Sequence, residues 1–188
     1  MGNVATNVST GKPNISGSVY VAPIGSPIPT NPTSTLPAEY TCLGYVSEDG
    51  LENANEMDVS VIKAWGGMIV YRSLTELNDT FKLTLIESEN VDVLKAVYGD
   101  ANVSVDASGD ISVDIKADDP QERIWVFELT LRGGRAKRIV IPDGAITSRD
   151  AITYNDSDAI GYGIEVSAYP DANGSTHKEY LEVASASV

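Results

Sequence analysis

The chain has 188 residues, 42% of them hydrophobic, and thirteen basic against twenty-seven acidic residues give a net charge of −14. This length suits one domain with extended arms, and the hydrophobic content excludes wholesale disorder. So acidic a protein does not hold nucleic acid by neutralising phosphates, and no run of eighteen apolar residues predicts a membrane span. The first eighteen residues lack the basic start and apolar middle of a signal peptide, so we expect synthesis and assembly in a cytoplasm.

Residues 1–38 are interpreted as an N-terminal arm and extended connector. Residues 1–18 are rich in Asn, Ser and Thr, and five prolines follow between positions 23 and 38. Such a density of proline excludes regular strand or helix and favours polyproline conformations. A segment already restricted by proline orders at low cost along a neighbouring subunit. A folded domain is expected over 39–183, with a flexible tail at 184–188.

A long loop or hairpin is predicted over residues 47–79. After a strand at 39–46 the chain is acidic and has no basic residue as far as Asp58. Two β-rich runs then flank Gly66-Gly67, which predicts a hairpin with a primed turn. Trp65 lies at its tip, where it either anchors an interface or folds back on its own domain.

One strand and one helix follow with clear patterns. Between Asp79 and Glu87 the apolar residues Phe81, Leu83 and Leu85 alternate with Thr80, Lys82 and Thr84, which predicts a strand with one wet face. Helix is predicted over 91–98, because Asn90 is an N-cap residue, Gly99 a left-handed stop, and the apolar residues between them form a stripe.

The remaining segments predict short strands separated by turns. A hairpin is expected within 103–115, and a strand at 122–132 has Glu128 and Thr130 on its wetter face. Gly133-Gly134 and Pro142-Asp143-Gly144 predict turns on either side of a strand at 137–141. Further strands are expected within 145–154, 160–169 and 179–183. About ten strands with one helix predict a mainly β fold, a β-sandwich or barrel.

Catalytic and metal chemistry have little support in the sequence. A nucleophile–base pair would rest on His177, the single histidine, which lies in a polar, turn-like stretch. Cys42, the single cysteine, is interpreted as a small buried hydrophobe. The acidic pairs Asp118-Asp119 and Asp156-Ser157-Asp158 lack the glycine and distal glutamate of a calcium loop. We therefore expect no catalytic residue, no metal and no cofactor.

A small basic cluster surrounds the turn at Gly133-Gly134. It consists of Arg132, Arg135, Lys137 and Arg138. The cluster is interpreted either as a solvated hairpin or as the electrostatic match of the acidic stretch 48–58 on another subunit. A head-to-tail contact of the second kind builds rings or filaments.

Five segments, in their order and spacing, resemble a known family. They are Leu43-Gly44-Tyr45-Val46-Ser47-Glu48-Asp49-Gly50, Ile62-Lys63-Ala64-Trp65-Gly66-Gly67, Asn90 to Gly99, Arg138-Ile139-Val140-Ile141-Pro142-Asp143 and Ala168-Tyr169-Pro170-Asp171. Over residues 18–182 the chain resembles the major tail tube protein of long-tailed, non-contractile bacteriophages. That family forms a structural polymer without an active site.

The resemblance implies a twisted β-sandwich that joins sheet edge to sheet edge in hexameric rings. Rings stack through the arm, the C-terminal segment and the long loop, and a negative lumen lets DNA pass without sticking. Implied partners are further copies of the chain and the tail terminator, tape measure and distal tail proteins. The candidates for inter-ring contact are Glu48, Asp49, Glu52, Glu56, Trp65, Gly66, Gly67, Arg132, Arg135, Lys137 and Arg138. The candidates for the lumen are Thr80, Lys82, Thr84, Glu128 and Thr130.

Two other classes of protein stay open on the sequence alone. A tail terminator or capsid decoration protein would form a closed oligomer. A secreted β-sandwich binding module would need an export signal and an exposed aromatic platform. For the tube subunit we also hypothesise that the arm and loop order only on a growing end.

Overall fold

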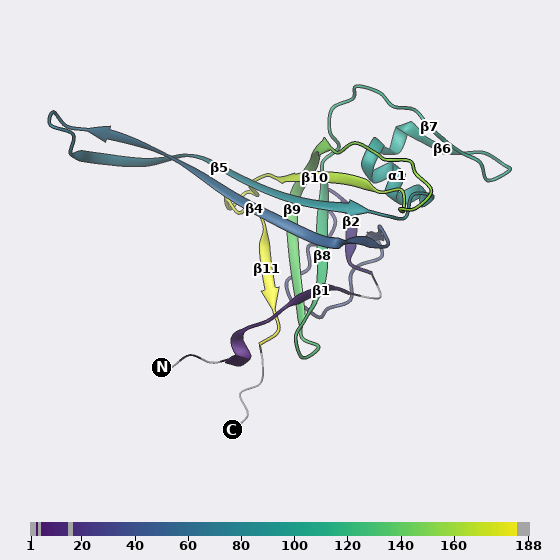
Figure 1. Ribbon diagram of the computed structural model, residues 1–188, viewed down its shortest axis with the longest axis horizontal. Helices are drawn as coiled ribbons and strands as arrows, with labels where there is room; N and C mark the ends of the chain where they lie inside the picture. The colour runs from purple at the N-terminus through teal and green to yellow at the C-terminus, as the bar shows by residue number, and fades with distance from the viewer. Residues whose placement is uncertain (1–2, 4, 15–16, 184–188) are drawn as a thin grey trace.

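The computed structural model describes residues 3, 5–14 and 17–183, and it confirms a mainly β chain with one short α-helix (Figure 1). Nine strands form one antiparallel sheet, and two more form a separate small hairpin. The sheet contains β1 (Gly11–Pro13), β2 (Val19–Pro23), β3 (Thr41–Cys42), β4 (Val46–Lys63), β5 (Ile69–Leu85), β8 (Arg123–Leu131), β9 (Ala136–Arg149), β10 (Tyr162–Ala168) and β11 (Lys178–Leu181). The other elements are β6 (Val103–Val105), β7 (Ile111–Val113), α1 (Val91–Tyr98) and 3-10 turns at Ala5–Asn7 and Asp100–Asn102. The predicted tail at 184–188 lies outside the described residues.

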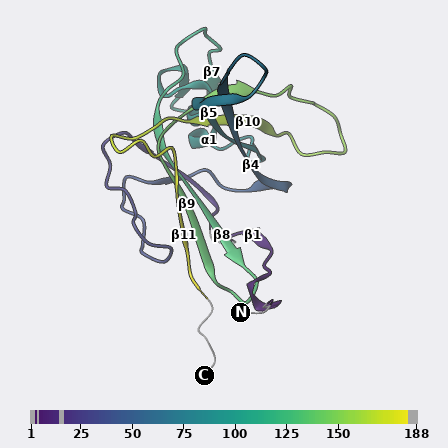
Figure 2. The same ribbon diagram turned by 90° about the vertical axis from the view of Figure 1, so that its left-hand side faces the viewer.

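The large sheet curls over itself without closing. Its strand order is β3-β2-β8-β9-β10-β5-β4, with β1 added beside β8 and β11 added beside β9. Strands β10, β5 and β4 cross the layer formed by β8 and β9 (Figures 1 and 2). Strands β3 and β4 each pair with one neighbour and end the sheet, so there is no closed barrel.

Strand β9 shows why the sheet can curl. The sequence predicts a turn at Pro142-Asp143-Gly144, and this prediction is wrong, because β9 runs through it from Ala136 to Arg149. The first part of β9 pairs with β11 and the last part with β10. The register with β8 shifts just here, between Trp125 and Arg123. Proline and glycine therefore mark an irregularity where the strand passes from one layer to the other.

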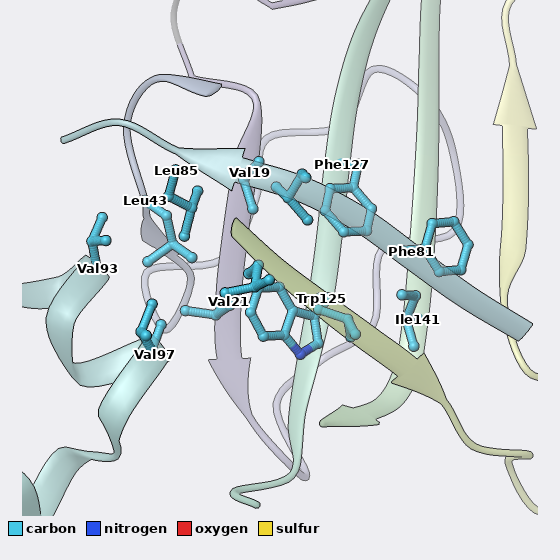
Figure 3. Close-up of a cluster of buried hydrophobic side chains, with 14 of the residues drawn as sticks. Val19, Val21, Leu43, Phe81, Leu85, Val93, Val97, Trp125, Phe127 and Ile141 are labelled. Carbon is cyan, nitrogen blue, oxygen red and sulfur yellow. The ribbon is translucent and has the colours of Figure 1, made fainter. Parts of the chain in front are cut away.

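The core fills the space between the two layers (Figure 3). Phe81 on β5 stacks on Phe127 of β8 with ring centroids 5.6 Å apart. Trp125 is fully buried, and its indole Nε1 donates to the Gly144 carbonyl over 3.1 Å. As predicted, Leu83 and Leu85 lie on the buried face of β5.

Helix α1 covers one end of this core and has the predicted boundaries. The side chain of Asn90 accepts a hydrogen bond from the Asp92 N–H, and Gly99 follows the helix with φ of 95°. Val93 and Val97 face the core cluster beside Leu43 (Figure 3). A helix of eight residues is not stable by itself in water, so this packing stabilises it.

The segment predicted as an N-terminal arm is largely part of the domain. β2 lies inside the sheet between β3 and β8, and its residues Val19, Val21 and Ala22 are buried. β1 pairs with the end of β8. The proline-rich connector between β2 and β3 has no regular structure, as predicted, and it packs against the outer side of β8 and β9 through Leu36 and Tyr40.

Candidate assembly surfaces

The β4–β5 hairpin leaves the body of the subunit as a long two-stranded ribbon (Figure 1). The acidic stretch is part of β4, a strand of eighteen residues that pairs with β5 at Val46 and again from Leu51 to Lys63. The predicted long loop or hairpin is therefore a hairpin. Every residue from Asn55 to Lys63 is exposed, and on β5 burial begins only at Asp79. We call residues 55–78 the distal hairpin.

The tip of the distal hairpin presents Trp65 to solvent. The Gly67 N–H donates to the Ala64 carbonyl over 2.9 Å, so Trp65 and Gly66 are the central residues of the turn. Gly66 and Gly67 have φ of 98° and 90°, whereas no residue other than glycine has positive φ among the described residues. Trp65 therefore excludes the predicted primed turn, which needs positive φ at its first central residue. Its side chain is fully exposed, so the alternative in which it folds back on its own domain is wrong.

One face of the distal hairpin is mostly apolar. Two cations share it, because Arg72 lies opposite Val61 and Lys63 lies opposite Ile69. Residues opposite one another in an antiparallel pair share a face, and here Met57 lies opposite Leu77 and Val59 opposite Leu74. We name this face the apolar stripe, and its members are Met57, Val59, Val61, Ile69, Leu74 and Leu77. All six are exposed. Several exposed apolar side chains on one face of a projecting element are typical of a binding site.

The opposite face of the distal hairpin is acidic near its root. Asp58 lies directly opposite Glu76, and Glu56, opposite Asn78, lies two pairs closer to the body on the same face. Like charges opposite one another destabilise a strand pair. The Asn78 side-chain amide donates to the Glu76 carboxylate over 2.8 Å, but no described cation pairs with these three carboxylates.

The basic turn between β8 and β9 is smaller than the sequence predicts. Arg132 is exposed and Arg135 partly exposed, whereas Lys137 is paired with Glu179 at 2.8 Å. Arg138, the fourth candidate, is 3% exposed and faces the connector. It is therefore not a surface cation. The local sequence does not predict this burial, because it depends on a distant segment: the connector covers the face of β9 that carries Arg138.

Arg138 clamps the connector to the body. Its guanidinium donates to the Asn31 carbonyl at 2.9 Å, to the Ser34 carbonyl at 2.7 Å and to the Ser34 hydroxyl at 3.0 Å. Its Nε and Nη2 also donate to the Glu128 carboxylate. These contacts use all five N–H donors of the guanidinium. The pairing also covers most of Glu128, so the wet face predicted for its strand is wrong at this position.

The outer face of β4, β5 and β10 carries a row of charged residues. Lys82 lies opposite Glu52 on β4 and opposite Glu165 on β10, and its Nζ lies 3.2 Å from an Asp150 oxygen. Thr80 and Thr84 are partly exposed on the same face. The sequence analysis missed Glu165, which alternates with the buried Ile164 and Val166. Three acidic residues, Glu52, Glu165 and Asp150, thus surround Lys82 on this face.

His177 is held by a buried carboxylate, against the expectation of a solvated turn. Its Nδ1 lies 2.5 Å from an oxygen of Asp79, which also accepts hydrogen bonds from Thr176 and Asn53. Burial by itself raises the pKa of the Asp79 carboxyl, but hydrogen bonds from Thr176, His177 and Asn53 outweigh it and hold the pKa below its ordinary value. Asp79 is therefore ionised at neutral pH.

Three further features concern the cysteine, metal ligands and membrane spans. Cys42 is partly buried in β3 and forms no disulfide. No three His, Cys, Asp or Glu side chains among the described residues gather as a metal site. No helix in this part is long and apolar enough to cross a membrane.

Comparison with protein families identifies what this chain is similar to. A family model described as phage tail tube protein matches residues 10–186 of the chain. No curated protein matches it. The match covers the whole sheet, the helix and the β4–β5 hairpin.

Proposed function

The chain belongs to the phage tail tube protein family, and we propose the following mode of assembly for it. Proteins of this family are structural components of the virion tail and not enzymes. Copies join sheet edge to sheet edge into hexameric rings, and the rings stack into the tube of a long-tailed, non-contractile phage. The tube is a negatively charged conduit through which DNA passes without tight binding. The tail terminator, tape measure and distal tail proteins are its further partners.

The observation that carries this proposal is the exposure of the distal hairpin. An isolated two-stranded ribbon is marginally stable in water, and this one carries the apolar stripe and a fully exposed Trp65. Exposed surfaces of this kind are stabilised when a partner covers them. A second copy in the next ring is the partner that a tail tube provides. Trp65 and the stripe are therefore the proposed centre of the inter-ring contact, with Gly66 and Gly67 shaping the turn.

Charge supports the direction of stacking. Among the described residues no cation forms an ion pair with Asp58 or Glu76, whereas Arg132 and Arg135 lie on the β8–β9 turn of the same subunit. In a head-to-tail stack, the acidic face of one copy meets the basic turn of the next. Glu48, Asp49, Glu52 and Glu56 remain candidates for this contact. Arg138 is withdrawn, because its donors are used within the subunit.

The sheet face around Lys82 is the proposed lining of the conduit. Thr80, Thr84 and Lys82 lie on it, now joined by Glu165 and Glu52. The free side of β4 ends the sheet beside this face. Joining that edge to the next subunit continues the face around a ring and removes an edge that would otherwise invite uncontrolled pairing. Thr130 remains a candidate, whereas Glu128 is withdrawn because Arg138 and the connector cover it.

The experiment is negative-stain electron microscopy of the purified chain over a concentration series. We expect hollow tubes of stacked rings with six-fold end views. Trp65→Ala removes an anchor of about 2–4 kcal/mol, so the critical concentration for tubes rises about 30- to 1,000-fold. Tyr154→Ala, an exposed aromatic on the loop before β10, is the matched control and leaves assembly unchanged. A persistent monomer or a single closed ring from the unmutated chain would contradict the proposal.

A further inference from the structure

The root of the distal hairpin is held by a buried carboxylate. Asp79 is 2% exposed and stands where β5 passes from the solvent-exposed ribbon into the core. Its Oδ1 accepts from Asn53 Nδ2 over 2.9 Å, which links it to β4. Its Oδ2 accepts from Thr176 Oγ1 over 2.6 Å and faces His177 Nδ1 at 2.5 Å. Because a carboxylate only accepts, His177 Nδ1 is the donor. One side chain thus ties both strands of the hairpin to a segment ninety-eight positions further along.

His177 is fixed from a second side. Its ring meets Phe81 edge to face, with centroids 5.1 Å apart, and Phe81 stacks on Phe127 in the core. The imidazole therefore fills the space between the core and the Asp79 carboxylate. Its side chain is 18% exposed, so it is a packed residue and not a solvated one.

The C-terminal segment that carries His177 is itself rigidly built. Asp171 accepts hydrogen bonds from the backbone N–H groups of Asn173 and Ser175 over 2.8 and 3.0 Å, and from Lys178 Nζ over 2.8 Å. The Ser175 hydroxyl donates to the His177 carbonyl over 3.0 Å. β11 then pairs with β9. A segment anchored at both ends in this way provides a fixed support for Asp79.

A fixed root matters because the ribbon is long. Ten residues of β5 separate Asp79 from the turn, about 33 Å at a rise of about 3.3 Å per residue. Over that length, a rotation of about 10° at the root moves Trp65 by about 6 Å. Two-stranded ribbons twist more variably than wide sheets, so pairing between β4 and β5 does not by itself fix the direction.

We propose that Asp79 and His177 are positioning residues, which set the direction of the distal hairpin by tying its root to segment 171–181. The inference rests on the proposed function, in which the hairpin docks on the next ring. Positioning of this kind presents Trp65 and the apolar stripe at one place before contact, so that less conformational freedom is lost on docking.

The direct test measures the direction of the hairpin in the monomer. Spin labels are placed at Met68→Cys near the tip and at Ser148→Cys, an exposed position on β9 of the large sheet, in a Cys42→Ser background. Their distance distribution is recorded by double electron–electron resonance. His177→Leu keeps bulk but loses the donor, and Asp79→Asn loses the charge. We expect both to broaden the distribution about twofold. His177→Asn restores a donor near the position of Nδ1 and keeps the narrow distribution.

Two further measurements separate positioning from general destabilisation. In His177→Leu, but not in His177→Asn, the pKa of the Asp79 carboxyl measured by NMR rises, because a hydrogen bond to its charged form is lost. Hydrogen exchange in β8 serves as the reference for global stability. Thr176→Val removes one donor at constant shape and gives an intermediate width, should the His177 variants fold poorly. Ser60→Ala, an exposed position on the same hairpin opposite Ser73, is the control without effect on the width.

The outcomes distinguish this inference from the proposed function. Narrow distributions in both Asp79→Asn and His177→Leu would overturn the positioning role, even if Trp65→Ala abolishes tubes. Broad distributions in these variants with unchanged tube formation in Trp65→Ala would support the positioning role and overturn the proposed contact. Broad distributions in Asp79→Asn and His177→Leu, together with at least tenfold weaker tube assembly in Trp65→Ala, would support both the positioning role and the proposed contact.

Discussion

The connector and the distal hairpin are two extended segments that the sequence assigns to the same task, yet they differ in the subunit. The connector lies on the body, where Arg138 holds Asn31 and Ser34 and the Tyr40 hydroxyl donates to the Pro27 carbonyl over 3.0 Å. The distal hairpin satisfies its backbone within itself and leaves its apolar side chains exposed. The connector therefore finds its binding partners within its own chain, whereas the apolar side chains of the hairpin are left uncovered.

This difference changes the hypothesis that arm and loop order together on a growing end. Backbone carbonyls bound by a buried arginine are costly to release, because both charge and carbonyls would lose their partners. The side chains of the apolar stripe have no hydrogen bonds to break, and burying them against a partner is favourable because apolar surface is removed from water. We thus expect assembly to act on the hairpin and to leave the connector as it is. An N-terminal truncation that tests an arm must also end before Gly11, since β1 and β2 belong to the sheet.

The largest expected effect is on the connector. Arg138→Met leaves the Glu128 carboxylate and two carbonyls without their donor, so we expect the free energy of unfolding to fall by about 3–5 kcal/mol. Chemical denaturation measures this, and hydrogen exchange should become fast at 31–38. Lys137→Met, whose pair with Glu179 is more exposed, should cost less than about 1 kcal/mol. An equal loss in the two variants would contradict the clamp.

The next effect is on the hairpin and concerns assembly alone. Leu74→Asp places a charge in the middle of the apolar stripe, so its burial against another copy becomes unfavourable by about 2 kcal/mol or more. We expect tube formation to be lost, while the free energy of unfolding of the monomer changes by less than about 0.5 kcal/mol. Electron microscopy and denaturation measure the two quantities. A matched change on the opposite face, Ser73→Asp, tells whether the stripe or the whole ribbon is the contact.

A smaller effect is expected from the like charges on the acidic face. Asp58→Asn removes the repulsion with Glu76, which should stabilise the hairpin by about 0.2–1 kcal/mol in low salt. Hydrogen exchange of the amides at 57–61 measures this locally. If Arg132 and Arg135 of a neighbour meet this face, the same change weakens tubes. Stronger tubes from Asp58→Asn would contradict the electrostatic match.

The smallest effect concerns the C-terminal segment, which resembles the connector in being bound to the body. Hydrogen bonds from Lys178 and from the backbone of Ser175 and Asn173 lower the pKa of the Asp171 carboxyl to about 2. A carboxyl with a lowered pKa stabilises the fold above its unfolded pKa of about 3.9, and this contribution is lost as the pH falls towards 2. NMR titration should find this pKa, and Asp171→Asn should remove the corresponding pH dependence. An ordinary pKa would contradict the anchored turn.

Local patterns predicted much of the fold, and long-range contacts account for the misses. The helix at 91–98, the strand predicted at 122–132 and the hairpin around Gly66-Gly67 depend on neighbours in the sequence. All three are confirmed, and the strand is observed at Arg123–Leu131. The turn at Pro142-Asp143-Gly144 is wrong, because pairing with β8 and β10 overrides local turn preference. Arg138 was assigned to the surface because its partners Asn31 and Ser34 are more than a hundred positions away.

The sequence by itself determined the β-rich class, the helix with its caps, the projecting hairpin and a resemblance to tail tube proteins. The class, the helix and the hairpin follow from periodicity, turn residues and composition, which act over a few residues. The resemblance rests instead on the order and spacing of five segments along the chain. The tertiary structure alone decided which charges remain at the surface, that His177 meets Asp79, and which face of the ribbon is apolar. Those outcomes depend on register and on contacts between distant segments, and the packing of the whole chain fixes both.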